Sequence, residues 1–259
     1  MPATEMVLSV EDLTVSFGGL RALYAVSLAV PAGEVRGVIG PNGAGKTTLF
    51  NAITGYVAAE RGTVRLRGQP ISHLRTHQIA ALGVRRTFQG GGLFPSLTAL
   101  ENVLLGRNDQ IRTGLWQTAI RSRSARAEER GAKNLAMVAL DELHLSDLAQ
   151  RVAADLSPGQ QRLVEIARVL VADATLLLLD EPAAGLSPVE REQLGQVLRE
   201  ISRTRGLTIV LIEHVLELIM KVSDVVTVLD LGRKVAEGTP EAVRQDPAVV
   251  RAYLGMGEA

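Results

Sequence analysis

The segment Gly40–Thr47, with the sequence GPNGAGKT, constrains the fold more than any other part of the chain. It matches the pattern G-x-x-x-x-G-K-[ST]; an apolar strand pattern precedes it (Arg36–Ile39) and a helical pattern follows it (Thr47–Ile53). The glycines let successive backbone N–H groups turn inward around a phosphate, and the helix N-terminus adds its dipole. In this pattern Lys46 reaches the β- and γ-phosphates and the Thr47 hydroxyl binds Mg²⁺. The full match in this context favours a phosphate site over a glycine-rich turn with an exposed lysine.

Apolar, β-rich runs alternate with helical patterns along the chain, which is typical of a layered α/β domain with a largely parallel sheet. The later runs are almost continuously apolar, as expected for strands covered on both faces. The early runs follow one another closely across Gly and Pro turns, so we expect part of the sheet to be antiparallel. The predicted strands are Val7–Phe17, Ala25–Val30, Glu34–Ile39, Thr63–Arg67, Val84–Thr87, Thr175–Leu179, Thr208–Ile212 and Val225–Leu229.

Three helix starts fit the capping box S/T-x-x-E/Q, in which two side chains bond to opposite N–H groups of the first turn. They are Thr98–Glu101, Ser157–Gln160 and Ser187–Glu190. In the last two, Pro158 and Pro188 occupy the first helical position, where an N–H would have no partner inside the helix.

The stretch Arg107–Ala154 differs from the rest of the chain in composition. It is rich in Arg and Ala, poor in β-branched residues and helical in pattern. It predicts a helical subdomain inserted in the α/β core. The basic run Arg121–Arg130 contains two glutamates, which favours a solvated helix face over a nucleic-acid patch.

Two carboxylates follow the apolar run Leu176–Leu179. A buried strand would deliver Asp180 to the sheet edge beside the phosphate loop, where it can hold Mg²⁺ through water. Glu181 would then point at the γ-phosphate and orient or deprotonate the attacking water. The alternative is a solvated strand end. The strand Thr208–Ile212 similarly leads to His214, which could bond the γ-phosphate, although spacing alone does not separate this role from a structural one.

Composition excludes several classes of protein. The chain has 259 residues, 28 basic against 28 acidic side chains, 3% aromatic residues and no cysteine. No global field draws it to nucleic acid, and thiol catalysis and Cys-bound metal are excluded. No run approaches the ~18 apolar residues of a membrane span. The N-terminus lacks the pattern of a signal peptide, so we expect the chain to stay on the side of the membrane where it is made.

These motifs, in this order, resemble the ATP-binding subunit of ABC transporters, and the resemblance covers nearly the whole chain. It implies one ABC ATP-binding domain over residues 1–259, with ATP and Mg²⁺ as cofactors. The fold class is α/β, a P-loop NTPase core of ABC type with an inserted α-helical subdomain and an antiparallel β-subdomain. The core would span about 1–89 and 156–259, and the helical subdomain about 90–155.

The resemblance also implies roles for single residues. Glu181 would be the catalytic base, His214 the switch histidine, and Gln89 a ligand of Mg²⁺ and water that senses the permease. Phe17 would stack on adenine, and Thr48 would touch the α-phosphate. The implied nucleotide-binding residues are Phe17, Gly40, Pro41, Asn42, Gly43, Ala44, Gly45, Lys46, Thr47, Thr48, Ser157, Gly159 and Gln160, and the implied metal ligands are Thr47, Gln89 and Asp180.

Two positions depart from the family pattern. Pro158 replaces the first glycine of LSGGQ and removes one N–H, but at the first helical position it leaves Ser157 and Gly159 able to face a phosphate. We therefore expect function to survive. Ser187 replaces the usual aspartate of the D-loop, which leaves the contact across a dimer open.

Within the family, the chain is most similar to the ATPases of branched-chain amino-acid importers, through RRTFQ from Arg85, LFPSLTALENVL, GQQRLVEIAR, LLLLDEPAAGLSP and the tail from Gly238. This implies a peripheral subunit on the cytoplasmic face of the inner membrane. Its partners would be a second ATP-binding subunit, identical or not, permease subunits and, indirectly, a substrate-binding protein, with no nucleic acid. The alternatives are another solute (an amide, urea or another amino acid), a soluble non-transport ABC ATPase and a catalytically inactive module.

The loop Gln89–Pro95 is the predicted contact with the permease. Three consecutive glycines make it flexible, and it then presents Leu93 and Phe94, which suit a groove on a partner helix. The alternative is that both side chains pack inside the helical subdomain.

Overall fold

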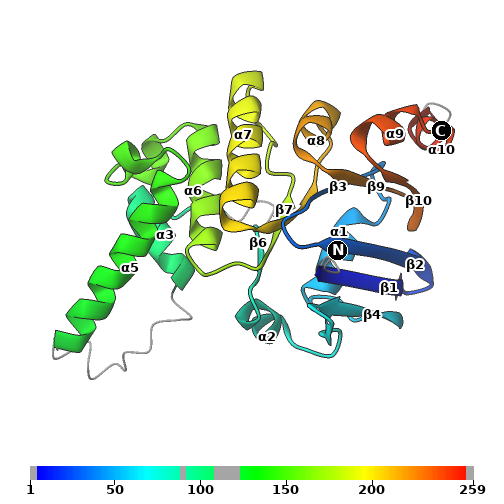
Figure 1. The fold of residues 1–259 in the computed structure, drawn as a ribbon, viewed down its shortest axis with the longest axis horizontal. Helices are drawn as coiled ribbons and strands as arrows, with labels where there is room; N and C mark the ends of the chain where they lie inside the picture. The colour runs from blue at the N-terminus through cyan, green and yellow to red at the C-terminus, as the bar shows by residue number, and fades with distance from the viewer. Residues whose placement is uncertain (1–4, 88–91, 108–122, 255–259) are drawn as a thin grey trace. The chain divides into compact units, whose positions relative to one another are not determined.

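The computed structural model describes residues 5–87, 92–107 and 123–254 (Figure 1). Contacts within the chain divide it into two compact units. Unit 1 comprises Met1–Arg86, Thr175–Ala184 and Leu198–Ala259, and unit 2 comprises Thr87–Ala174 and Gly185–Val197. The subdomain boundaries expected near residues 89 and 155 stay a prediction, and the division by contacts assigns the helix Pro158–Leu170 to unit 2.

Unit 1 contains a six-stranded sheet in the order β10-β9-β3-β8-β7-β6. Neighbouring strands from β9 to β6 run parallel, and β10 alone pairs antiparallel, with β9. Every residue of β3, β7 and β8 is buried, as their apolar sequences predict. The strands are β3 (Val35–Ile39), β6 (Val84–Arg86), β7 (Leu176–Asp180), β8 (Thr208–Ile212), β9 (Val225–Asp230) and β10 (Arg233–Gly238).

A second, four-stranded sheet in unit 1 is antiparallel throughout, in the order β2-β1-β4-β5, which confirms the predicted antiparallel part. Its strands are β1 (Met6–Phe17), β2 (Leu20–Pro31), β4 (Arg61–Leu66) and β5 (Gln69–Pro70). Strand β2 begins earlier than predicted because Leu20 already pairs with Phe17 across the Gly18-Gly19 turn. Strands β5 and β10 were not predicted: β5 has two residues, and β10 is a largely polar strand at the edge of its sheet.

The core of unit 1 joins helix α1 (Lys46–Ile53) to residues from both sheets, with Phe50 fully buried. Because successive side chains of a strand point to opposite faces, Val38 of β3 faces this core, whereas the neighbouring Gly37 faces α8 (Leu216–Val222). Helices α9 (Pro240–Gln245) and α10 (Pro247–Leu254) follow β10, and α2 (Thr76–Ala81) precedes β6.

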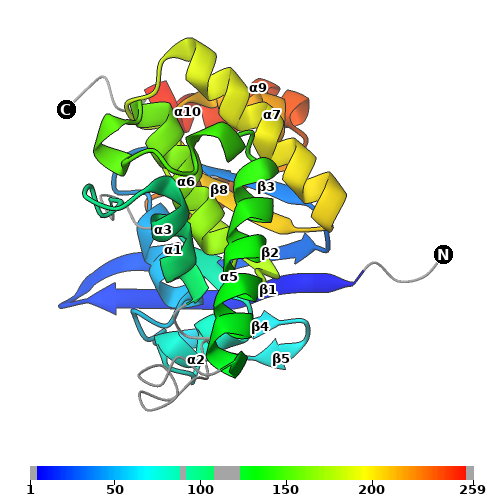
Figure 2. The same cartoon turned by 90° about the vertical axis from the view of Figure 1, so that its left-hand side faces the viewer.

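Unit 2 is helical, as the composition of its sequence predicts. Helices α3 (Ala99–Leu104), α5 (Arg123–Asp141) and α6 (Pro158–Leu170) pack side by side (Figures 1 and 2). Short 3-10 turns lie at Leu105–Arg107, Ser146–Leu148 and Ala153–Asp155. Helix α7 (Pro188–Arg205) begins in unit 2, and its residues from Leu198 belong to unit 1. No helix in the described ranges combines the length and apolar character that crossing a membrane requires.

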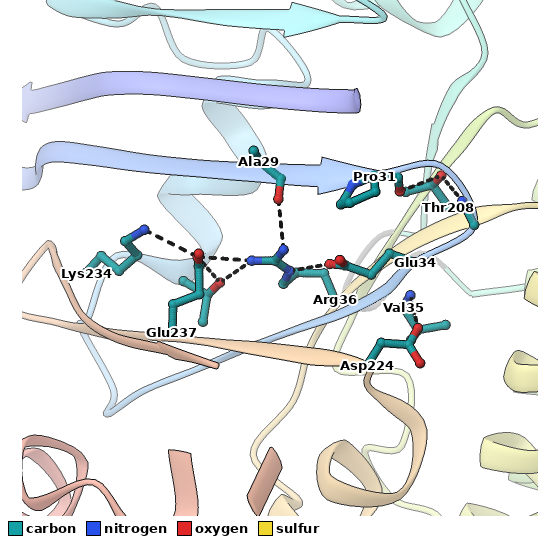
Figure 3. A network of polar contacts seen from close by, with 11 residues as sticks. Ala29, Pro31, Glu34, Val35, Arg36, Thr208, Asp224, Lys234 and Glu237 are labelled. Carbon is teal, nitrogen blue, oxygen red and sulfur yellow. Dashed lines mark hydrogen bonds and ion pairs between the residues drawn. The ribbon is translucent and has the colours of Figure 1, made fainter. Parts of the chain in front are cut away.

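A buried arginine joins β3 to three other strands of unit 1 (Figure 3). The Arg36 side chain lies within a predicted apolar strand and its residue is 3% exposed. Its guanidinium donates to Glu34 Oε1 at 2.6 Å, to Thr227 Oγ1 of β9 at 3.1 Å and to the carbonyl oxygen of Ala29 in β2 at 2.8 Å. It also pairs with Glu237 of β10 at 3.0 Å. The strand that leads into the phosphate loop is therefore held by charge as well as by ladder hydrogen bonds.

Replacing Arg36 by methionine should lower the free energy of unfolding by about 3–5 kcal/mol, because both carboxylates lose their buried counter-ion. Denaturant titration followed by circular dichroism measures the change. The control is Arg61→Met on the exposed start of β4, which should stay within about 0.5 kcal/mol of the parent. Equal stability of the two variants would contradict the role given to the network.

Candidate functional site

The phosphate loop runs from the end of β3 to the first residue of α1, and two of its glycines are required by close contacts. A Cβ on Gly45, whose φ is 97°, would lie 2.6 Å from the carbonyl oxygen of Ala22. A Cβ on Gly40, whose φ is 150°, would lie 2.0 Å from the carbonyl oxygen of Leu229. Any other residue would shift the neighbouring backbone, so these glycines fix the path of the loop.

Lys46 is the first residue of α1 and is buried at the centre of this loop. Its Nζ donates to the carbonyl oxygens of Gly40 at 2.7 Å and Pro41 at 2.8 Å. Burial lowers the pKa of Lys46, and the carboxylates of Glu181 and Asp180 act in the opposite direction. The loop therefore surrounds an amine that two nearby acids favour in its charged form.

A pocket of about 380 Å³ opens beside the loop, all of it in unit 1. Phe17, predicted to stack on adenine, is 48% exposed at the end of β1, and the lining given by the described residues does not include it. The exposed apolar side chains of Leu20 and Leu231 line the pocket instead. The lining residues are Leu20, Arg21, Ala22, Asn42, Gly43, Ala44, Gly45, Lys46, Thr47, Thr48, Glu181, His214 and Leu231.

The ends of β7 and β8 bring two of the predicted catalytic residues together. Glu181 Oε1 lies 3.0 Å from His214 Nε2, and both side chains line the pocket. Glu181 has a φ of 48°, and its N–H donates to the carbonyl oxygen of Ile212 at 2.9 Å. The backbone turn after β7 is thus tied to β8, which holds the carboxylate beside the histidine.

Asp180, the predicted Mg²⁺ ligand, is the last residue of β7 and is almost fully buried. Its Oδ2 accepts from the guanidinium of Arg86 at 2.8 Å. The same guanidinium donates to Asn51 Oδ1 of α1 at 2.7 Å. Sequence reasoning missed Arg86; the available signal was a second charged residue inside the short strand pattern that precedes Gln89.

Glu213 is a second residue that sequence reasoning left without a role. It is buried at the end of β8 and accepts from the N–H groups of Ala183 at 2.5 Å, His214 at 3.1 Å and Val215 at 3.4 Å. Burial raises the pKa of Glu213, and these N–H donors act in the opposite direction. Its carboxylate ties the segment after Glu181 to the backbone of His214. The signal was an acid placed directly between a buried strand and a histidine.

In unit 2, helix α6 begins as the sequence predicts. Ser157 is the N-cap, its hydroxyl accepts from the Gln160 N–H, and Gln160 Oε1 accepts from the Ser157 N–H. Pro158 occupies the start of the helix, so the substitution in residues 156–160, which correspond to LSGGQ and are called the signature below, leaves the helix intact. Both the Ser157 hydroxyl and the Gly159 N–H donate to Glu190 Oε1, each at 3.1 Å.

The chemistry of the oxygen donors fits Mg²⁺. Thr47 lines the pocket, and Asp180 is the last residue of strand β7. Mg²⁺ in nucleotide sites is bound by one or two such oxygens together with phosphates and water. Gln89, the third predicted ligand, lies outside the described residues, as do the glycines at positions 90 and 91.

Comparison with known proteins agrees with the nucleotide-binding motifs described above. A family model described as ABC transporter matches residues 23–184, and one described as Branched-chain amino acid ATP-binding cassette transporter matches residues 233–257. The high-affinity branched-chain amino acid transport ATP-binding protein BraF of Pseudomonas aeruginosa is 42% identical over 96% of this chain and 98% of BraF. Its counterpart LivG of Escherichia coli K12 is 42% identical over 97% of this chain and 99% of LivG.

Solved structures of ATP-binding cassettes share the fold. The ADP conformation of MJ1267, a cassette of an ABC transporter, superposes with a TM-score of 0.83 at 32% identity, over 97% of this chain and 100% of that one. A dimeric post-hydrolysis state of the cassette MJ0796, bound to ADP and Pi, gives a TM-score of 0.73 at 25% identity, over 90% of this chain and 98% of that one.

Replacing Glu213 by glutamine should destabilise the chain by about 1–3 kcal/mol, because an amide nitrogen must then face at least one of the buried N–H groups. Thermal and denaturant unfolding give the measurement. Glu217→Gln on the exposed side of α8 is the matched control and should be nearly neutral. A neutral Glu213→Gln would show that the carboxylate does not hold these two segments.

Proposed function

Because the chain belongs to the ATP-binding family of ABC transporters, we propose that it is the ATP-hydrolysing subunit of an importer of branched-chain amino acids. The chain is an ATPase coupled to transport, as this family is. The solute is the finer part of the proposal, and it is supported by the match over residues 233–257 and by the two relatives at 42% identity. Amides, urea or other amino acids are the alternatives.

The observation that carries the ATPase mechanism is the pairing of Glu181 with His214 beside Lys46 in one pocket. Lys46 and the loop N–H groups would bind the β- and γ-phosphates. Thr47 and Asp180 would hold Mg²⁺, which neutralises charge that develops on the phosphates. Glu181 would take a proton from the attacking water, with its carboxylate oriented by the imidazole 3.0 Å away.

Arg86 extends this mechanism to the carboxylate that would hold the metal. Its ion pair orients the Asp180 carboxylate, and its second bond anchors the guanidinium on α1. The next described residue after β6 is Thr87, and Gln89 follows two positions later. Arg86 therefore links the predicted metal ligand to the start of the segment that leads to the permease loop.

A second ATP-binding subunit would complete the site. Helix α6 presents the Ser157 hydroxyl and the Gly159 N–H at its N-terminus, where an anion is stabilised by the helix dipole. We assign these donors, with Gln160 as the capping partner, to the γ-phosphate of ATP bound on the opposite subunit. The dimeric structure of MJ0796 supports dimer formation for this fold.

The predicted permease contact has an exposed apolar side chain. Phe94 is 55% exposed, which favours docking over packing inside unit 2. The fully buried side chain of Asn102 holds the Phe94 backbone by two hydrogen bonds. Asn102 Oδ1 accepts from the Phe94 N–H at 2.8 Å, and Nδ2 donates to the Phe94 carbonyl oxygen at 3.1 Å. We propose that this surface docks on permease subunits, with the chain peripheral on the cytoplasmic face of the membrane and a substrate-binding protein acting indirectly.

Replacing Glu181 by glutamine should preserve Mg·ATP binding and reduce hydrolysis by about 10²–10⁴-fold, because the amide cannot take a proton. Phosphate release measures turnover, and gel filtration with ATP should show an accumulated dimer. Glu217→Gln, at an exposed side chain of α8 that pairs with Lys221, is the control for a lost surface charge and should hydrolyse normally. Parental turnover in Glu181→Gln would refute the assignment of the base.

Replacing Phe94 by alanine should leave the ATPase activity of the isolated subunit intact while reducing its assembly with permease subunits, because the apolar anchor is lost. Co-purification and transport-coupled hydrolysis in a reconstituted importer are the measurements. Tyr56→Ala removes an exposed aromatic residue from unit 1 and should couple normally. A Phe94→Ala subunit that misfolds or couples normally would favour the packing alternative.

A further inference from the structure

The signature helix already holds an anion of its own chain. Glu190 Oε1 accepts from both the Ser157 hydroxyl and the Gly159 N–H, at 3.1 Å each. These are the two groups assigned above to a γ-phosphate. All of these residues belong to unit 2, so the contact is internal to one compact part of the chain. A carboxylate oxygen therefore stands where a phosphate oxygen of the nucleotide is expected.

The neighbourhood is shaped around this carboxylate. A Cβ on Gly159 would lie 2.5 Å from Glu190 Oε1, so glycine at this position leaves the space that the carboxylate fills. The other oxygen, Oε2, accepts from the Ser187 N–H at 2.9 Å and from its hydroxyl at 2.8 Å. These bonds, first those from Ser187, lower the pKa of Glu190, which favours the charged form.

Ser187 is the residue that replaces the usual aspartate of the family. An aspartate here would set a second negative charge beside the Glu190 carboxylate, and like charges this close destabilise each other. The serine hydroxyl donates a hydrogen bond instead. The departure at Ser187 and the position of Glu190 are therefore parts of one arrangement.

We propose that Glu190 is an internal stand-in for the γ-phosphate, which occupies the signature donors of the free subunit and must be displaced when two ATP-bound subunits close. The proposal rests on the proposed function, because it needs the signature to meet nucleotide across a dimer. A carboxylate and a phosphate cannot share the same two donors, since their charges repel and the donors are already used. The free energy needed to release Glu190 thus opposes closure and raises the ATP concentration at which the dimer forms.

The test compares dimer formation against Mg·ATP concentration in the Glu181→Gln background, where hydrolysis does not dissolve the dimer. Adding Glu190→Gln weakens the contact by removing its charge, so half-maximal dimer formation should need about tenfold less ATP, the effect of one charge-assisted hydrogen bond. Analytical ultracentrifugation measures the dimer. Binding of ATP to the monomer, measured in the presence of Ser157→Arg to block closure, should not change.

Ser187→Ala is the matched control. It removes the hydroxyl that caps α7 but keeps the Glu190 contact with Ser157 and Gly159. If Glu190 acts only as a cap of α7, Glu190→Gln and Ser187→Ala should show the same dependence of dimer formation on ATP concentration. An unchanged or higher ATP requirement in Glu190→Gln overturns the proposal. If Glu190→Gln fails to fold, Glu190→Asp replaces it, because the side chain is shorter by one methylene and no longer reaches both donors; the same lowered requirement is expected.

A different set of results would contradict the proposed function itself. If Glu181→Gln alone forms no dimer with ATP, or if Ser157→Arg dimerises as readily as its parent, the signature does not meet nucleotide across a dimer, and the stand-in falls with that assignment. If both behave as expected and only Glu190→Gln does not, the composite site stands and Glu190 is a helix cap.

Discussion

Parallel pairing of β3, β8 and β7 is the constraint on which the candidate site depends. In parallel strands all carboxyl ends meet at one edge of the sheet. The phosphate loop follows β3, Asp180 is the last residue of β7 and Glu181 comes directly after it, and Glu213 and His214 follow β8. Groups separated by more than a hundred residues in the sequence are therefore brought together by the strand order and not by the conformation of a long loop. The buried Arg36 adds links from β3 to β2, β9 and β10, so the strand before the loop is held by side-chain contacts as well as by its ladder.

Patterns contained in a short stretch of sequence were predictable. The phosphate loop, the buried strands and the capping boxes at Thr98, Ser157 and Ser187 each depend on residues close together in the sequence. The structure has them where expected. The antiparallel sheet also follows from closely spaced strands and glycine turns. Strand β10 escaped prediction because an edge strand is only half covered and needs no apolar period.

Contacts between distant charged side chains were not predictable from local patterns. Arg86 and Asp180 are 94 positions apart, and Glu213 finds Ala183 30 positions away. A sequence shows only that an arginine interrupts a strand or that an acid precedes a histidine. The strand order decides which partner lies within reach of each charge. Because buried polar groups must be hydrogen-bonded, each charge then pairs with the partner that this order brings near it. Phe17 illustrates the same limit: its type suits adenine, while the pocket is lined by its neighbour across the turn, Leu20. The roles of the site residues therefore stay predictions even where their positions agree.

Asn102 has a consequence for the substitutions that the segment at residues 94–98 can accept. Within the part of the chain that the structure describes, its buried amide bonds to main-chain atoms of residues 94, 97 and 98 alone, so it specifies the course of the backbone whatever side chains are displayed there. Substitutions at the tip of this segment leave the internal frame unchanged. The displayed side chains and the internal frame of this segment can therefore change independently of one another.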